Sequence, residues 1–231
     1  MLIHGLNKLT LLDYPGLTAC TVFTGGCNFR CPFCHNRSLV LTPESQPVIS
    51  EEEFFAFLDK RKGLLEGVCI TGGEPTLQPD LSDFIKKIKA AGYKVKLDTN
   101  GTRPDVIKNL VESGLVDYVA MDIKNSLKKY GLSAGIENYD TANVEKSIEY
   151  LKGGLVDYEF RTTVVGGLND RKSFEDLAET LSGAEKYFLQ AFMDSGDLID
   201  GTSTGVALEK MREFLPLLRK TIRKVEIRGI D

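Results

Sequence analysis

Short apolar runs alternate along this chain with longer stretches in which apolar residues recur every three or four positions. Apolar runs are typical of buried strands, and the longer spacing is typical of helices with one buried face. The predicted strands lie near 17–24, 67–71, 93–98, 116–123, 157–165, 186–192 and 223–228, and the predicted helices near 51–62, 80–91, 104–114, 141–152, 171–182 and 206–221. This alternation predicts a parallel sheet with crossover helices.

Three of the predicted helices carry signals at their ends. Ser50 followed by Glu53 matches the capping box that starts a helix. Gly92 follows the second helix and is typical of a helix C-terminus. Pro104 stands in the first turn of the third helix, where its missing N–H is not needed. These residues support the boundaries that the apolar spacing indicates.

Polar residues gather where the predicted strands end, rather than being scattered over the chain. The end segments are Thr24-Gly25-Gly26-Cys27, Thr71-Gly72-Gly73-Glu74, Asp98-Thr99-Asn100, Asp122-Ile123-Lys124, Arg161-Thr162-Thr163 and Gln190. In βα barrels the active site lies at the carboxyl ends of the strands. Six βα units with a short last strand are too few to close an eight-unit barrel. We therefore expect an α/β fold, an incomplete (β/α)6 TIM-like barrel with a short extra C-terminal strand and one open side.

Composition suits one globular domain with a full core, since the 231 residues are 42% hydrophobic and 27% charged, with a net charge of −4. We expect a leader over 1–16, the core barrel over 17–200, and a C-terminal helix and strand over 201–231. No apolar run approaches the roughly 18 residues of a membrane span, and no signal peptide is recognisable. Charges of both signs are mixed, which argues against nucleic-acid binding. The sequence thus predicts a cytoplasmic protein without a membrane partner.

The cysteines provide the strongest chemical signal. Cys27, Cys31 and Cys34 have the spacing C-x3-C-x2-C. Three thiolates suit a 4Fe-4S cluster that keeps one iron without a protein ligand, whereas ordinary electron carriers use four cysteines per cluster. A structural zinc site needs four ligands, so zinc remains an alternative only with His35 as the fourth. The other two cysteines, Cys20 and Cys69, stand in apolar strands and are expected to be buried structural thiols.

This cysteine motif, with Phe33 before its last cysteine, resembles the signature of the radical S-adenosylmethionine (SAM) enzymes. The continuation Cys34-His35-Asn36-Arg37 is similar to the activases of glycyl-radical enzymes. The segment Leu11-Leu12-Asp13-Tyr14-Pro15-Gly16 looks most like the activases of anaerobic ribonucleoside-triphosphate reductase. The resemblance extends from about Leu6 to Arg161.

The resemblance implies a 4Fe-4S cluster and SAM as cofactors and a flavodoxin or ferredoxin as electron donor. It implies reductive cleavage of SAM to methionine and a 5′-deoxyadenosyl radical that abstracts hydrogen from a glycine of the partner enzyme. The cofactors carry this chemistry, and the protein supplies orientation and protection. No side chain is therefore expected to act as a conventional acid, base or nucleophile.

The resemblance also implies a set of SAM contacts. Phe33 is expected to lie against the adenine, Asn36 belongs to the motif, and the loop Gly72-Gly73-Glu74 resembles the family's methionine-binding loop. In that loop the glycine N–H groups suit the SAM carboxylate, and main-chain carbonyls or Glu74 suit its amino group.

Further contacts are expected from the later strands. Asp98, Thr99, Asp122 and Lys124 match the strand ends of the activases, and the two aspartates could also hold a monovalent cation. Arg161 is expected to point into the barrel toward the SAM carboxylate or ribose. Where activases of this type often carry a histidine after the sixth strand, this chain has Gln190, which becomes the candidate ribose contact.

Other functions remain open. The protein could activate another glycyl-radical enzyme, of the pyruvate formate-lyase type. It could instead be a small-molecule radical SAM enzyme such as a 7-carboxy-7-deazaguanine synthase. The Cys-His-Asn continuation and the lack of an arginine-rich substrate pocket disfavour the small-molecule enzyme. A further alternative, from another class, is a non-catalytic iron–sulfur or zinc protein, which would not need the Gly-Gly-Glu loop or the Asp and Lys residues at the strand ends.

Overall fold

The computed structural model describes residues 1–194 and 196–229, and its centre is one sheet. Its eight strands follow the order of the sequence, with β1 antiparallel to β2 and every later pair parallel. The strands are β1 (Gly5–Thr10), β2 (Ala19–Thr24), β3 (Gly67–Gly72), β4 (Lys94–Thr99), β5 (Tyr118–Asp122), β6 (Asp157–Val164), β7 (Lys186–Ala191) and β8 (Lys224–Arg228). Because β1 and β8 stand at opposite ends of this order, the sheet does not close, and the expected incomplete barrel is confirmed.

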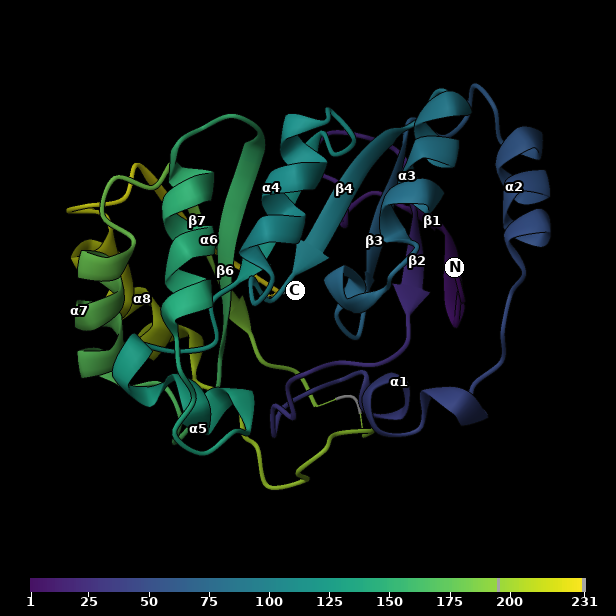
Figure 1. Cartoon of the computed structure of the whole chain (residues 1–231). Helices are drawn as coiled ribbons and strands as arrows, with labels where there is room; N and C mark the ends of the chain where they lie inside the picture. The colour runs from purple at the N-terminus through teal and green to yellow at the C-terminus, as the bar shows by residue number, and fades with distance from the viewer. Residues whose placement is uncertain (195, 230–231) are drawn as a thin grey trace.

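Helices cover the outer side of this sheet (Figure 1). They are α1 (Arg37–Leu41), α2 (Glu51–Lys60), α3 (Leu81–Ala90), α4 (Pro104–Glu112), α5 (Tyr130–Ala134), α6 (Ala142–Lys152), α7 (Arg171–Thr180) and α8 (Leu208–Leu218). The short helices α1 and α5 lie at the lower edge of the picture, where the parallel strands end. All six helices and all seven strands predicted from the sequence are present, with ends shifted by a few residues.

The predicted helix signals are present, and at Ser50 the structure shows the side-chain half of the capping box. The Ser50 hydroxyl accepts a hydrogen bond from the Glu53 N–H at 3.1 Å, and Pro104 occupies the first turn of α4. Gly92 has a φ of +91° directly after α3, a conformation that residues with a side chain rarely adopt. Local sequence therefore determines where these helices start and stop.

Strand β1 and the segment after it were not expected as structure. β1 pairs with only one neighbour and is largely exposed along its length, so it lacks the apolar run by which a buried strand is recognised. After β1, the Asp13 carboxylate accepts a hydrogen bond from the Thr21 hydroxyl. The buried ring of Tyr14 packs on Tyr118, with ring centroids 6.1 Å apart. The segment thus covers the end of the barrel opposite the carboxyl ends of the strands.

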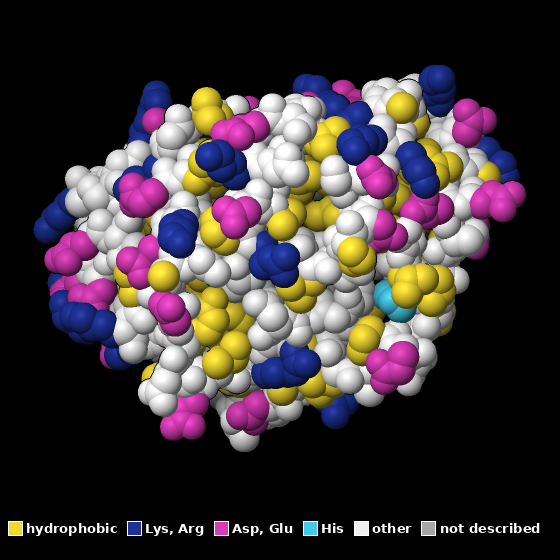
Figure 2. Space-filling model, in the orientation of Figure 1, with side chains coloured by type: hydrophobic (Ala, Val, Ile, Leu, Met, Phe, Trp, Pro, Cys, Tyr) yellow, Lys and Arg dark blue, Asp and Glu magenta, His cyan; other side chains and the backbone are white. Residues whose placement is uncertain are grey.

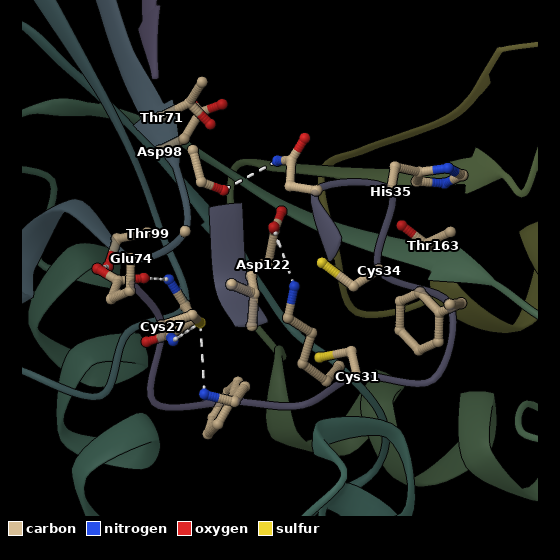
Figure 3. Close-up of a pocket in the computed structure, with 18 of the residues that line it drawn as sticks. Cys27, Cys31, Cys34, His35, Thr71, Glu74, Asp98, Thr99, Asp122 and Thr163 are labelled. Carbon is tan, nitrogen blue, oxygen red and sulfur yellow. Dashed lines mark hydrogen bonds and ion pairs between the residues drawn. The ribbon is translucent and has the colours of Figure 1, made fainter. Parts of the chain in front are cut away.

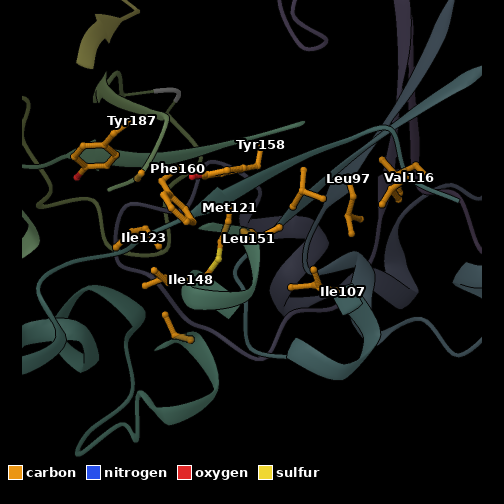
Figure 4. Close-up of a cluster of buried hydrophobic side chains, with 14 of the residues drawn as sticks. Leu97, Ile107, Val116, Met121, Ile123, Ile148, Leu151, Tyr158, Phe160 and Tyr187 are labelled. Atoms are coloured by element: carbon orange, nitrogen blue, oxygen red, sulfur yellow. The ribbon is translucent and has the colours of Figure 1, made fainter. Parts of the chain in front are cut away.

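The apolar core fills the space between the sheet and the helices (Figure 4). Leu97 and Met121 on the strands face Ile107 of α4 and Ile148 of α6, and all four side chains are fully buried. Strand residues alternate between the two faces, so the other face carries charged and polar side chains into the barrel. The fold thereby separates a dry outer layer from a polar interior.

On the surface, acidic and basic side chains are intermixed over the face drawn in Figure 2. Within the residues that the structure describes, no helix has both the length and the apolar character needed to cross a membrane.

Candidate active site

A cavity opens at the carboxyl ends of the strands and collects most of the predicted site residues (Figure 3). It is lined by residues from the cysteine loop, from the Gly-Gly-Glu loop and from the ends of β4 to β7. The lining consists of Cys27, Phe29, Cys31, Phe33, Cys34, His35, Asn36, Val40, Thr71, Gly72, Gly73, Glu74, Asp98, Thr99, Asn100, Asp122, Lys124, Thr163 and Gln190.

The three motif cysteines share this cavity. In Figure 3 the sulfur atoms of Cys31 and Cys34 lie on one side of it and Cys27 lies on the other. No group of three His, Cys, Asp or Glu side chains in the described part of the chain is arranged to hold one metal ion. Three cysteine thiols on one cavity are the donor set expected for a 4Fe-4S cluster with one open iron, whereas a structural zinc ion needs four ligands.

The electrostatic surroundings of the thiols depend on Lys124. Burial raises the pKa of Cys27, Cys31 and Cys34, to about 12 for Cys31, and the positive charge of Lys124 lowers all three pKa values. The Cys27 sulfur also accepts hydrogen bonds from the Phe29 N–H at 3.3 Å and from the Asn100 side chain at 3.9 Å. Metal ligation requires thiolates, so a nearby cation and N–H donors favour the ligating form.

Helix α5 and the residues directly after it pack against the cysteine loop. The Arg30 N–H donates to the Ala134 carbonyl at 2.8 Å, and the Phe29 ring meets Tyr139 edge-on with centroids 5.2 Å apart. A Cβ on Gly135 would lie 2.0 Å from the Arg30 carbonyl oxygen, so only glycine allows this approach. The segment near 125–140 thus contains a short helix that holds the cysteine loop in place.

The Gly-Gly-Glu loop lies directly against the cysteine loop. The Gly73 N–H donates to the Thr24 carbonyl at 2.9 Å, and the Glu74 N–H donates to the Gly26 carbonyl at 2.8 Å. A Cβ on Gly73 would stand 1.9 Å from the Gly26 oxygen. The two loops are therefore joined backbone to backbone, and the glycine is needed for their contact.

Glu74, which the sequence suggested for the SAM amino group, forms its hydrogen bonds within the protein. Its side chain is buried, and its carboxylate accepts hydrogen bonds from the Thr99 hydroxyl at 2.7 Å and from the Asn100 N–H at 2.6 Å. The Thr76 N–H and hydroxyl donate to the same carboxylate. Burial raises the pKa of Glu74, and these donors lower it in part. Glu74 thus ties the end of β3 to the end of β4.

Five charged side chains form a chain across the barrel interior, in the order Lys96, Asp98, Arg161, Asp122 and Lys124. Arg161 donates to Asp122 at 2.9 Å and to Asp98 at 3.3 Å. Lys124 donates to Asp122 at 3.1 Å, and Lys96 forms a close ion pair with Asp98. Burial alone would raise the pKa of Asp122, but Arg161 and Lys124 hold it at about 2. Arg161 and Lys96 likewise lower the pKa of Asp98 against the effect of burial, so both carboxylates are ionised at neutral pH.

The cavity contains all of the predicted cofactor-binding side chains except Arg161. Arg161 is not among the described residues that line the cavity, and its guanidinium forms ion pairs with the Asp98 and Asp122 carboxylates. The Asn36 side chain, which does line it, donates to the Gly72 carbonyl at 2.9 Å. The roles of all these residues in binding SAM stay predictions.

The sequence placed Asn100 and Thr163 at strand ends without assigning either a contact, and both line the cavity. Lys96, which carries the first charge of the buried chain, was missed from sequence. The sequence contains a signal for the position of Lys96. It stands two residues before Asp98 between apolar neighbours, and alternate residues of a strand share a face, so Lys96 is predicted on the same face as Asp98. Its burial, with 1% of the side chain exposed, is otherwise unusual for lysine.

The remaining candidates have clear positions. Cys20 and Cys69 are fully buried, as expected for structural thiols. The Cys69 sulfur lies 3.7 Å from Asp98 and 3.8 Å from Lys96, below the cavity. His35 lines the cavity and stacks on Phe192 with ring centroids 5.4 Å apart.

Comparison with known proteins gives consistent matches. Residues 21–181 match the family model of the radical SAM superfamily. A Methanocaldococcus jannaschii protein with the name "Putative glycyl-radical enzyme activating enzyme" is 34% identical, over 100% of this chain and 97% of its own length. A 7-carboxy-7-deazaguanine synthase of Koribacter versatilis is 36% identical over 64% of this chain and 62% of its own. A crystal structure of Streptococcus suis SuiB bound to S-adenosylmethionine has a TM-score of 0.70 at 14% identity, covering 89% of this chain and 49% of SuiB.

Proposed function

Because the chain belongs to the radical SAM superfamily and, within it, to the glycyl-radical enzyme activating enzymes, we propose that its cavity binds a 4Fe-4S cluster through Cys27, Cys31 and Cys34 and binds SAM beside it. We propose further that the enzyme forms a glycyl radical on anaerobic ribonucleoside-triphosphate reductase. The observation that carries the proposal is the convergence of the three cysteines, the Gly-Gly-Glu loop and the charged strand ends on one cavity.

In the proposed reaction the cofactors supply the chemistry, and the side chains bind and orient them. Enzymes of this superfamily use a 4Fe-4S cluster and SAM. When bound, these supply an electron to SAM and, from SAM, a carbon-centred radical that can take a hydrogen atom from a glycine. The chain's own residues bind and orient: the three thiolates ligate, Lys124 places a positive charge beside them, and buried Phe33 offers an apolar surface to the adenine. A flavodoxin or ferredoxin is the proposed electron donor.

For SAM we propose contacts that follow from the geometry of the cavity. The carboxylate is expected at the Lys124 ammonium and at the backbone near Gly72, because the Gly73 N–H already donates to the Thr24 carbonyl. The amino group is expected at main-chain carbonyls of this loop, because the Glu74 carboxylate already accepts four hydrogen bonds from the protein. Thr99, Asn36 and Gln190 are proposed to complete the site; of these, Gln190 is the candidate ribose contact.

The expected monovalent cation is the one cofactor that the residues do not fit well. Each oxygen of Asp98 and Asp122 already meets a cationic nitrogen of Lys96, Arg161 or Lys124. The pair of aspartates therefore has no oxygen without a positively charged partner.

Substitution of Lys124 tests the proposed SAM contacts. We expect Lys124→Ala to weaken SAM binding by roughly 10- to 150-fold, because a charge-assisted hydrogen bond contributes about 1.5–3 kcal/mol. Cluster absorbance should persist, since Lys124 is not a proposed ligand. Anaerobic equilibrium dialysis with labelled SAM measures the change, with exposed Lys128→Ala as the matched control. Asp98→Ala should behave like Lys124→Ala, and unchanged SAM affinity in both would remove them from the binding site.

The open barrel supports a macromolecular substrate. The sheet leaves β1 and β8 unpaired with each other, and the longest candidate for a lid, near 125–140, is used to support the cysteine loop. A small substrate would need a cover to keep out water, whereas a glycine loop of a large partner can enter an open side and cover the site itself. The segment from Leu11 to Gly16 supports the choice of the ribonucleotide reductase, with a pyruvate formate-lyase type enzyme as the alternative partner.

The partner is identified by the radical it receives. Reduced protein with SAM should produce a glycyl-radical EPR doublet on an anaerobic ribonucleotide reductase, with 5′-deoxyadenosine released in step. A reductase with its radical glycine changed to alanine should give no doublet. A doublet formed only on a pyruvate formate-lyase would change the partner. Turnover of a purine-like metabolite, with no radical on any glycyl-radical enzyme, would instead favour the small-molecule enzyme suggested by the similarity to the deazaguanine synthase.

A further inference from the structure

Two carboxylates of the cavity lining, those of Asp98 and Asp122, face each other and need a positive charge between them. Asp98 ends β4 and Asp122 ends β5, and adjacent parallel strands bring the two side chains to one level of the barrel. Both are only partly exposed, at 15% and 31% of the side chain. Like charges in such a position repel, and removal from water strengthens the repulsion. A cation shared by both groups would resolve it.

Arg161 occupies the shared position. Its Nε donates to Asp122 Oδ1 at 2.9 Å, and one terminal nitrogen donates to Asp98 Oδ2 at 3.3 Å. The remaining oxygens are taken by lysines, Asp98 Oδ1 by Lys96 and Asp122 Oδ2 by Lys124. Each carboxylate thus uses one oxygen for Arg161 and the other for a lysine.

Neighbouring contacts direct Arg161 to this position. Glu159 lies two residues earlier on the same face of β6 and would be a competing partner. Its carboxylate is already bound by Arg228, at 2.8 and 3.0 Å, and by the Tyr118 hydroxyl at 2.9 Å. Because Glu159 already binds Arg228 and Tyr118, the Arg161 guanidinium pairs with the carboxylates of Asp98 and Asp122.

We propose that Arg161 is a built-in cation: its guanidinium takes the place of a monovalent metal ion between Asp98 and Asp122, so that the enzyme binds SAM without requiring sodium or potassium. A guanidinium suits this role because its planar fork can bridge two carboxylates and stays charged at any working pH. Being part of the chain, it cannot dissociate when salt changes. Arg161 is therefore a positioning residue that acts on SAM through the two aspartates and Lys124.

The charge balance of the buried chain supports this assignment. Lys96, Arg161 and Lys124 contribute three positive charges against the two negative charges of Asp98 and Asp122, which leaves one positive charge. An added metal ion would raise this excess in a partly desolvated site. One net positive charge instead matches one ligand carboxylate. The identity of that ligand as SAM rests on the proposed function, whereas the bridge itself does not.

The first test uses the wild-type protein in sodium, potassium and choline chloride at equal ionic strength. Because the cation is built in, the Tm of the apoprotein and the SAM affinity of the reconstituted protein should be the same in all three salts. A SAM affinity that rises severalfold in sodium or potassium over choline would show that an ion binds beside Arg161 and would overturn the proposal. The measurement needs no variant, so it cannot fail through misfolding.

The second test removes the guanidinium. Arg161→Ala should lower the Tm by roughly 6–20 °C, since breaking a buried ion pair leaves charges without a partner. SAM affinity should fall by about tenfold or more. Sodium, potassium or a low concentration of guanidinium should restore part of the Tm relative to choline. Arg161→Lys should keep more stability than Arg161→Ala, because it retains one positive charge.

Arg171→Ala is the matched control, because Arg171 forms an exposed ion pair with Glu175 at 3.1 Å and should change neither Tm nor its response to salt. An Arg161→Ala protein as stable as this control, with no response to added cations, would contradict the inference. The Tm measurements require neither cluster nor radical chemistry. A failure of the proposed activity therefore leaves them intact, and the two hypotheses can be separated.

Discussion

Replacing Cys27, Cys31 or Cys34 by alanine is expected to abolish the cluster and with it every radical reaction of the protein. Anaerobically reconstituted wild-type protein should bind about four irons and four sulfides, as a four-iron cluster requires. Each variant should retain little iron, because two thiolates cannot hold the cluster against loss to solvent. Iron and sulfide analysis, together with the EPR signal of the dithionite-reduced protein and its change on adding SAM, provides the measurement.

The other two cysteines are the controls for this experiment. Cys20 and Cys69 are fully buried and lie outside the cavity lining, so Cys20→Ala and Cys69→Ala should keep the iron content and the EPR signal. Each should cost only the modest stability of a small buried side chain. Tight zinc binding without iron uptake in the wild-type protein would contradict the cluster assignment, as would loss of iron in either control.

Replacing Gly73 by alanine is expected to separate the Gly-Gly-Glu loop from the cysteine loop. The new Cβ would stand 1.9 Å from the Gly26 carbonyl oxygen and 2.6 Å from its carbon. Both atoms are backbone and cannot rotate away, so the two loops must separate. Separation would weaken the Gly73–Thr24 and Glu74–Gly26 hydrogen bonds. We expect a loss of about 2–4 kcal/mol in the free energy of unfolding.

This loss corresponds to a decrease of roughly 4–16 °C in Tm for a chain of this size, measurable by thermal unfolding of the apoprotein. SAM binding should be lost as well, because the loop proposed to hold its methionine moves away from the cysteine loop. Gly201→Ala is the control: no atom lies within 4 Å of its added Cβ, and its φ is not positive. A Gly73→Ala protein with unchanged Tm and SAM affinity would show that the loops can open at little cost.

Much of the fold could be predicted because its signals are local. Parallel strands buried on both faces appear as apolar runs, and each covering helix repeats its apolar residues with the helical period. Ser50 and Pro104 mark helix starts by side-chain chemistry that needs no distant partner. Strand β1 could not be predicted, because an edge strand with one neighbour buries too little to show either pattern.

The candidate site residues could also be predicted from the sequence. The spacing of Cys27, Cys31 and Cys34 specifies a shared ligand set in a single loop, and the polar residues after each strand lie at one edge because parallel strands end together. These conclusions follow from sequence separation and strand direction alone.

What each of those residues touches was decided only by the tertiary structure. The sequence does not show that Glu74 is satisfied by the β4 end, nor that Arg161 bridges Asp98 and Asp122 while Lys96 neutralises the far side. These partners come from different strands, so their distances depend on how the sheet curves. A sequence specifies which charges enter the barrel; only the curvature of the barrel brings particular charges within hydrogen-bonding distance, where Coulomb energies become large.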